Sequence, residues 1–470
     1  MAPFLKARSI HPLVAPLLVS SLAFAAACGD TDSGGGELAV PTRYEFASRF
    51  EGEDSVSYAG QTFRQVLITS MKREFATIQE EIDNDGAVFS TGEVRARLNL
   101  YYTFDSDSAG QLGHGVVTDP APAQITFDDI TTGKDLRGKI AGQDPTGQHV
   151  DWNAAGVVGW GDAVAPDALV AQWMDELDAL AVDFSAGTIP SDPDGAAIPV
   201  WYVDADGRDY QQLMEKFLLG AVNFSQAADD YLDDDIEGKG LRADNSTVEE
   251  GAPYTALEHA WDEGFGYWGG ARDYLAYDDA DIADSAAHDH DGNSAIDLLS
   301  EYSFGAAQNA SKRDRGAAET APTDLSKDTM TAFLTGRAII AAADGDLSEA
   351  ELMALQAQRD AAIEGWENAL AATAVHYIND TLRDLNDDAV GFDTLAKHWS
   401  ELKGFALALQ FNPRMTLTDE QFAALHTWIG DAPGMDAEYQ TNLLEARSVL
   451  AEAYNFDAAN IGDDLGEGGW

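Results

Sequence analysis

Apolar residues recur at three- and four-residue steps along most of the chain, which is the spacing of positions on one face of a helix. Strand-like alternation of apolar and polar residues is scarce. The pattern predicts helices over residues 57–82, 91–103, 168–184, 209–230, 253–277, 325–343, 349–385, 394–409, 419–428 and 439–454. So many amphipathic segments predict an all-α helical bundle. We expect one helical domain over residues 41–456, and two bundle-like halves divided near residue 289 are an alternative at this length.

Two parts of the chain interrupt the helical pattern. Residues 105–166 are rich in Gly, Asp, Thr and Pro and show little periodicity. We therefore expect a long irregular insertion there, with a few short strands around residues 124–127. Residues 457–470 are predicted to form an acidic tail.

The first residues have the pattern of an export signal. Lys6 and Arg8 precede an apolar run over residues 13–24, and small residues lead to Cys28. This run is too short to span a bilayer, and its charged start and small-residue end are those of a cleaved signal peptide. We predict a lipoprotein-type signal peptide over residues 1–27, lipidation of Cys28 and a flexible tether over residues 28–40. Ordinary cleavage before an unmodified Cys28 is the alternative.

The predicted anchor also sets the expected location. Gly29, and not an aspartate, follows Cys28, which favours onward transfer to an outer membrane. We expect the protein at the periplasmic face of the outer membrane or at the cell surface, held by its lipid anchor and able to meet an envelope protein partner.

Composition excludes several classes of function. The chain has 82 acidic and 28 basic residues and a formal net charge of -54. A charge of this size repels nucleic acid, so no nucleic-acid partner is expected. Adaptation to salty water and selection for cation binding both explain such a charge, and the spread of the acidic residues along the whole chain favours adaptation to salty water. Because Cys28 is the only cysteine, the fold can contain no disulfide, thiolate zinc site or cysteine nucleophile.

Residues 289–301 have the spacing of a calcium-binding loop. Oxygen side chains occur at alternate positions and an apolar residue stands at the eighth, as in the loop of helix-loop-helix (EF-hand) calcium proteins. The predicted ligands are Asp289, Asp291, Asn293, the carbonyl of Ala295, Asp297 and Glu301. Ser294 replaces the usual glycine, and Glu301 falls one residue beyond the usual bidentate position. We therefore predict an EF-hand-like calcium site of weakened affinity and structural role.

Two histidines each share a predicted helix face with a carboxylate. His259 precedes Asp262 and Glu263 by three and four residues, and His398 precedes Glu401 by three. If the two helices pack side by side, these residues form a second site that suits iron, manganese or zinc. The alternative for each histidine is a structural hydrogen bond.

The residues that follow His259 and an acidic run before it also have patterns that can indicate a binding site. Five aromatic residues between 261 and 274 can wall off a site, and the glycines at 264, 266, 269 and 270 predict that something lies close to that backbone. The acidic run 229–235 (DDYLDDD) can collect cations, but an exposed acidic helix end is the commoner meaning of such a run.

The sequence contains few recognisable catalytic motifs. The sequence has no His-Glu-x-x-His zinc motif, no Gly-x-Ser-x-Gly nucleophile turn and no thiol nucleophile in the fold, so no catalytic residue is assigned. We expect a protein that binds metal, and an enzyme is the less favoured class. One alternative is a metal-dependent hydrolase with Glu263 or Glu401 as the base. Another is a non-catalytic envelope interaction protein with only the structural calcium site.

Three stretches resemble a family of exported bacterial lipoproteins known as domain of unknown function 4856. They are residues 259–274, the loop from Asp289 into Ser300-Glu301-Tyr302, and residues 397–413 (KHWSELKGFALALQFNP). The resemblance extends from about Tyr44 to Tyr454. It implies export and a lipid anchor, and it implies no activity.

A looser likeness is to the imelysins, helical periplasmic proteins of iron uptake with a Gly-x-His-x-x-Glu motif. Here Ala396-Lys397-His398-Trp399-Ser400-Glu401 has the histidine and the glutamate but lacks the glycine. The likeness implies a helical fold and a role in the acquisition of iron or another metal. Since imelysin-like proteins were classed with metallopeptidases, it also implies the hydrolase alternative.

Overall fold

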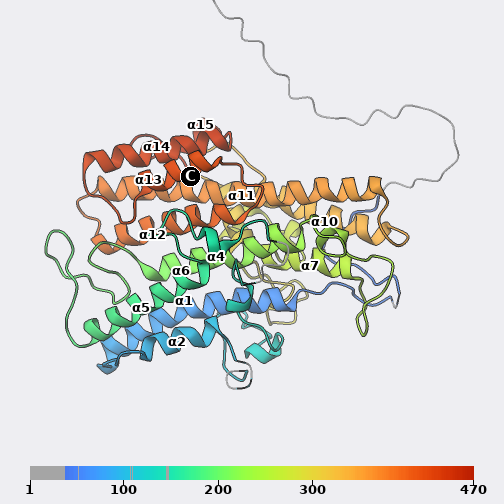
Figure 1. The fold of residues 1–470 in the computed structure, drawn as a ribbon, viewed down its shortest axis with the longest axis horizontal. Helices are drawn as coiled ribbons and strands as arrows, with labels where there is room; N and C mark the ends of the chain where they lie inside the picture. The colour runs from blue at the N-terminus through green and yellow to red at the C-terminus, as the bar shows by residue number, and fades with distance from the viewer. Residues whose placement is uncertain (1–37, 51, 106, 108–109, 144–147) are drawn as a thin grey trace, which may run out of the picture. The chain divides into compact units, whose positions relative to one another are not determined.

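The computed structural model describes residues 38–470, except residues 51, 106, 108–109 and 144–147 (Figure 1). The expected signal peptide, Cys28 and the tether as far as residue 37 lie outside the described residues. Among the helices that the structure does describe, none combines the length and the apolar character needed to cross a membrane.

The described residues are helical and contain no β-sheet, as the hydrophobic pattern predicts. The longer helices are α1 (Ala59–Asp85), α2 (Glu93–Tyr102), α5 (Pro166–Ser185), α6 (Tyr210–Leu218), α7 (Ala256–Trp268), α9 (Gly305–Arg315), α10 (Leu325–Ala342), α11 (Glu349–Leu385), α12 (Phe392–Ala408), α13 (Asp419–Ile429) and α14 (Ala437–Ala453). The shorter helices are α4 (Trp152–Ala155), α8 (Asp279–Asp284) and α15 (Ala458–Ile461). The prediction of an all-α bundle is confirmed.

The longest helix, α11, lies at the centre of the packing. A capping box begins it, because the Ser348 hydroxyl accepts the Glu351 amide and the Glu351 carboxylate accepts the Ser348 amide. α11 packs against α9, α10, α12 and α14, while α12 packs in turn against α6. Large side chains such as Trp366 and Ile378 fill the contact and are almost fully buried.

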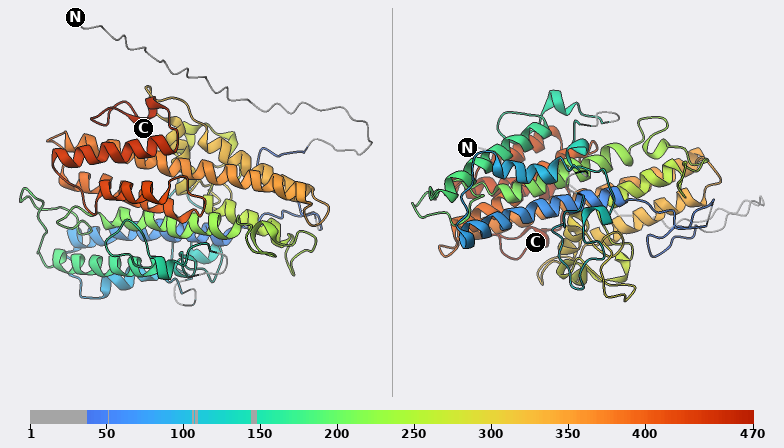
Figure 2. Two further views of the ribbon diagram at one scale, coloured as in Figure 1. Left: turned by 45° about the horizontal axis from the view of Figure 1, so that its top comes forward. Right: turned by 90° about the horizontal axis from the view of Figure 1, so that it is seen from below.

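The remaining helices extend this packing on the side of α12 that faces away from α14. α6 contacts α1, and α1 contacts α2 and α7, while α5 covers α2. Figure 1 shows this order from α14 at the top to α2 at the bottom, and the left view in Figure 2 also keeps α1 and α2 apart from α13 and α14. Residues Leu38–Trp470 form one compact unit, so no division into halves occurs near residue 289.

Gly404 shows how closely two of these helices approach. This glycine lies inside α12, although glycine is a poor helix former. A β-carbon on Gly404 would lie 2.5 Å from the β-carbon of Lys216 on α6, which is too close for any side chain. The glycine therefore allows α6 and α12 to pack, and that gain outweighs its low helix propensity.

Three regions differ from their predicted form. The predicted helix 209–230 is α-helical only to Leu218, and its continuation contains the π-helical segments η3 (Leu219–Phe224) and η4 (Ala227–Tyr231). The predicted helix 253–277 ends at Trp268, because Gly269 follows it in the left-handed conformation with φ 83°. The predicted strands around residues 124–127 form only an isolated bridge between Gly113 and Thr126 among the described residues.

The last residues also differ from the expected acidic tail. Trp470 is only 5 % exposed, and its indole nitrogen donates to the carbonyl of Arg313 at 3.0 Å. Its own carbonyl accepts from the Asn379 side chain at 3.1 Å. The burial of one aromatic residue at the end of an acidic segment holds this segment against α9 and α11.

Candidate metal centre

Three predicted calcium ligands meet in space. Asp289, Asp291 and Glu301 each offer a carboxylate oxygen, and these oxygens lie within 4.8 Å of one another. Glu301 is only 4 % exposed, although it stands one residue beyond the usual position. Three carboxylates converging on one point form the hard oxygen environment that calcium prefers.

The backbone of the loop explains why Glu301 reaches the group. Its Oε1 accepts the amide of His290 at 3.0 Å, and its Oε2 accepts the amide of Asp297 at 2.8 Å. The side chain therefore ties the beginning of the loop to its end. This arrangement takes the place of a bidentate glutamate at the usual position.

Ser294 makes the turn that glycine makes in the usual calcium loop. Its φ is 66°, in the left-handed region where a residue with a β-carbon is strained. The amides of Asn293 and Ser294 donate to the two oxygens of Asp289 at 3.0 and 2.9 Å. These bonds hold the turn in place of the missing glycine.

The other predicted ligands have protein partners. The Asn293 side-chain oxygen accepts the amide of Ala295 at 2.8 Å, so the turn itself uses this oxygen. Asp297 accepts from the Gln124 side chain and from the Ser300 hydroxyl, both at 2.8 Å. The structure thus brings together three of the six predicted residues and directs Asn293 and Asp297 to other contacts.

No helix directly flanks the loop on either side. α8 ends at Asp284 before the loop, and α9 begins only at Gly305 after it. Instead the apolar residue Ile296, fully buried, exchanges backbone hydrogen bonds with the insertion. Its amide donates to Ala121 at 3.0 Å, and its carbonyl accepts from Ala123 at 2.8 Å. The loop therefore fastens the insertion to the helical domain.

The three carboxylates of the loop have no cationic partner among the described residues. The nearby His290 turns its Nδ1 to the buried Asp273, 2.9 Å away, and its Nε2 contacts Arg43. His290 is therefore directed to Asp273 and Arg43, and Arg43 also pairs with Glu45 at 2.9 Å. Asp289, Asp291 and Glu301 keep a concentrated negative charge that a bound cation would neutralise.

His259 and Glu263, predicted ligands of the second metal site, both contact other groups of the protein. The His259 Nδ1 lies 3.1 Å from the carbonyl of Ser57, and its ring stacks on Tyr254. Its Nε2 lies 3.8 Å from Glu263, whose carboxylate also accepts the Gln61 amide at 2.7 Å. His259 and Glu263 are thus neighbours on one face of α7, as their spacing predicts.

Asp262 lies away from His259, in a fully buried ion cluster. Its Oδ1 accepts from Arg337 Nε at 3.0 Å and from the Tyr44 hydroxyl at 2.9 Å. Arg337 is itself fully buried, and its Nη1 donates to Glu258 at 3.1 Å. Burial raises the pKa of Asp262 above its ordinary value, and the charge of Arg337 opposes that shift. Asp262 is therefore a structural group.

The second predicted histidine faces a different helix. The Nδ1 of His398 lies 2.7 Å from Asp384 on α11, and its Nε2 lies 3.9 Å from Asp380. His376 on α11 approaches the same Asp380 at 3.4 Å. Glu401, three residues after His398, instead lies 3.9 Å from the buried Lys216.

The structure does not join the two histidines in one site. α7 packs against α1, α10 and η4, whereas α12 packs against α6, α11 and α13. Among the described residues, the groups with three or more converging ligands include neither His259 nor His398. Spacing along each helix is local, and it carries no information on which helices become neighbours.

The glycines near His259 are explained by the protein's own side chains. A β-carbon on Gly264 would lie 2.7 Å from Leu232, and one on Gly266 would lie 2.6 Å from Tyr58. The aromatic residues around them, including Trp261 and Trp268, are fully buried in the core. What lies close to this backbone is therefore packed side chains, and the aromatic residues are core.

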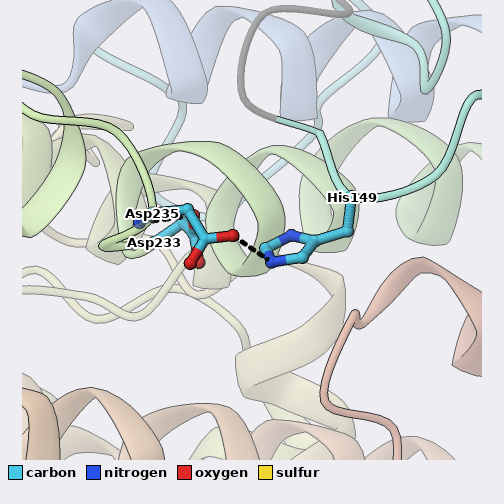
Figure 3. A group of neighbouring side chains, drawn as sticks. All are labelled: His149, Asp233 and Asp235. Atoms are coloured by element: carbon cyan, nitrogen blue, oxygen red, sulfur yellow. Dashed lines mark hydrogen bonds and ion pairs between the residues drawn. The ribbon is translucent and has the colours of Figure 1, made fainter.

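A second converging group contains a histidine that the sequence reasoning missed. His149 meets Asp233 and Asp235, and the three ligand atoms lie within 4.8 Å of one another (Figure 3). The acidic run 229–235 was a signal for this group, but Asp229, Asp230 and Asp233 in it are 5 % exposed or less. Nothing in the sequence ties the run to His149 in the irregular insertion.

Comparison with known proteins identifies one family. The family model described as Domain of unknown function (DUF4856) matches residues 167–427, which is more than half of the chain. The match includes α7, the calcium-type loop and His398. The searches of curated proteins and of solved structures found no match.

Proposed function

This chain belongs to the family described as Domain of unknown function (DUF4856), and from its own residues we propose that it is an exported, lipid-anchored metal-binding protein. The loop of Asp289, Asp291 and Glu301 binds calcium in this proposal. The observation that carries it is the convergence of three carboxylates with no cationic partner among the described residues. Export and anchoring rest on the signal-peptide pattern that ends at Cys28.

Calcium at the loop has a structural task. The loop bonds to the insertion through Ile296 and through the contact between Asp297 and Gln124. Neutralising the three carboxylates stabilises this junction, and it also relieves part of the repulsion in a chain of net charge -54. Calcium is abundant outside the cell, so even a site of millimolar affinity stays filled there.

Acquisition of iron or another metal is the wider role proposed for this protein. It requires a second site, with ligands suited to a transition metal. His259 and His398 do not support that site as a pair, because each has partners on different helices. The same observation favours the other candidate function, a non-catalytic envelope interaction protein in which both histidines are structural.

Elemental analysis tests the proposal directly. The unit Leu38–Trp470 and its Asp291→Asn variant are purified without chelator. Asp388→Asn is the control, because it removes the same charge from an exposed residue outside the loop. We expect one calcium per chain in the wild type and in the control, and none in Asp291→Asn. A wild type that retains no calcium when dialysed against millimolar calcium would contradict the proposal.

A further inference from the structure

We propose that His149, Asp233 and Asp235 form a second metal site, for a transition-metal ion such as zinc. One nitrogen and two carboxylate oxygens of these residues lie within 4.8 Å of one another. Figure 3 shows the imidazole and the aspartates approaching each other from two separate segments of the chain. The site is independent of the calcium loop and shares no residue with it.

The imidazole is oriented as a metal ligand. Its Nδ1 lies 2.5 Å from Asp229 Oδ1, and the backbone amide of His149 donates to the same carboxylate at 3.1 Å. Its Nε2 lies 2.7 Å from Asp235 Oδ2. A histidine that gives one ring N–H to a buried carboxylate and turns the other nitrogen to the metal is a common arrangement in metal sites.

Two carboxylates face the ring nitrogens of His149. Asp229 and Asp235 bracket one imidazole, and a neutral ring would direct a nitrogen lone pair at one of the two carboxylates. A metal ion on Nε2 removes this repulsion, as does a proton on the ring or on one of the two carboxyl groups. A divalent ion would bring two positive charges to this group, where Asp233, 5 % exposed, already has Arg414 as a cationic partner at 3.0 Å.

Asp233 is fixed by other contacts. Its Oδ1 accepts from Arg414 Nη1 at 3.0 Å, and its Oδ2 accepts the amide of Asp235 at 3.1 Å. A small cavity lined by Asp233 together with Asp230, Ile236 and Lys239 has room for about one water molecule. Three protein ligands and one water would complete a four-coordinate ion.

The donor set indicates the class of metal. An imidazole nitrogen with carboxylate oxygens suits zinc, iron, manganese or cobalt, whereas calcium takes oxygen ligands only. The loop of Asp289, Asp291 and Glu301 has no nitrogen in its converging group. In this proposal the loop binds calcium and the site at His149 binds a transition-metal ion.

Zinc and cobalt titrations test this site on the metal-free unit Leu38–Trp470, with calcium present to keep the loop filled. The variants are His149→Gln and Asp235→Asn, and the matched control is Glu237→Gln, since Asp235 and Glu237 are both exposed acidic residues of the same segment. We expect one zinc per chain in the wild type and the control. We expect at least a tenfold weaker zinc affinity in each of the two variants.

The cobalt spectrum gives a readout that a structural role of His149 would not affect. Bound cobalt should show visible absorption that His149→Gln alters and Glu237→Gln preserves. The proposal is overturned if the wild type binds no zinc at about 100 µM, or if both variants bind it as tightly as the wild type. Equal weakening in Glu237→Gln would also overturn it, because binding would then follow general surface charge. None of these results bears on calcium at the loop.

Discussion

Asp262 and Asp291 were both predicted as metal ligands, and the structure places them in opposite electrostatic conditions. Asp262 lies in a core where Arg337 bonds both it and Glu258, and Tyr44 adds another donor. Asp291 lies in a loop beside two other carboxylates, and no cation among the described residues pairs with them. The difference teaches that spacing along the chain does not decide whether the protein itself compensates a carboxylate, as at Asp262, or leaves it to a cation, as we propose for Asp291.

A third carboxyl extends this comparison. Asp209 is 3 % exposed at the start of α6, where it accepts the amide of Gln212 at 3.1 Å. Burial raises its pKa to about 7, with the nearby charge of Glu401 acting in the same direction. A buried carboxyl in this chain is thus stabilised by an arginine at Asp262, by a proton at Asp209, and in our proposal by a metal ion at Glu301 of the loop.

The largest expected effect comes from removing the arginine. Arg337→Met leaves Asp262 as a buried carboxylate without its cation and leaves Glu258 with only the longer contact to Arg49 at 3.7 Å, so we expect the free energy of unfolding to fall by ~3–5 kcal/mol. Urea denaturation measures it. The control is Arg95→Met, which removes an exposed pair with Asp175 and should cost no more than ~1 kcal/mol. If Arg337→Met lowered the free energy of unfolding as little as Arg95→Met does, Arg337 would not be the group that compensates the buried carboxylates.

The next effect depends on pH. Because the folded state raises the pKa of Asp209 to about 7, it binds this proton more tightly than the unfolded state does. The cost of ionising Asp209 is absent below its unfolded pKa, near 4, and grows as the pH rises to 7. Asp209→Asn should therefore gain stability over the wild type across that window, by up to ~4 kcal/mol. Denaturation midpoints at pH 4, 5.5 and 7 measure the gain.

Two checks make the pH prediction specific. Asp206→Asn, on an exposed residue of the same segment, should show no such pH-dependent gain. A constant difference between Asp209→Asn and the wild type at all three pH values would contradict the raised pKa.

Removal of calcium should have a comparable, slightly smaller effect. At a free calcium concentration of one hundred times Kd, binding stabilises the folded state by ~2.7 kcal/mol. We expect a chelator to lower the Tm of the wild type and to leave the Tm of Asp291→Asn unchanged. Differential scanning calorimetry at several calcium concentrations measures both. An equal chelator effect in the two proteins would place the calcium outside the loop.

The smallest effect concerns the strained turn. Ser294 has φ 66°, so Ser294→Gly removes the clash of a β-carbon in the left-handed region and should stabilise the loop by ~1 kcal/mol. Calcium affinity should then rise severalfold, because less of the binding energy is used to hold the turn. Ser294→Ala keeps the β-carbon and should show no rise. Calorimetric titration with calcium distinguishes the two variants.

Helical periodicity predicted most of this fold. The bounds of α11 agree with its predicted range because a capping box and a sustained apolar face both act locally. The end of α7 was missed by several residues, since the left-handed Gly269 outweighed the aromatic residues that follow it. The short amphipathic α9 was also missed, because its buried positions are mostly alanine and serine, which give a weak apolar signal.

The site was less predictable than the fold. The convergence of Asp289, Asp291 and Glu301 could be predicted because these residues lie within thirteen positions of one another, whereas the contacts of Asn293 and Asp297 could not. His149 could not be found, because its partners lie 84 and 86 residues away and only tertiary packing joins them. The partners of His259 and His398 depended in the same way on which helices pack together.

The account's central claim is that the loop carboxylates bind a cation and the carboxylates near Arg337 do not. Calcium titration of the metal-free unit Leu38–Trp470 tests it, with Asp291→Asn and Asp262→Asn compared side by side and circular dichroism used to verify that both are folded. The account predicts one calcium per chain in the wild type and in Asp262→Asn, and none in Asp291→Asn. Calcium binding that survives Asp291→Asn but is lost in Asp262→Asn would contradict it.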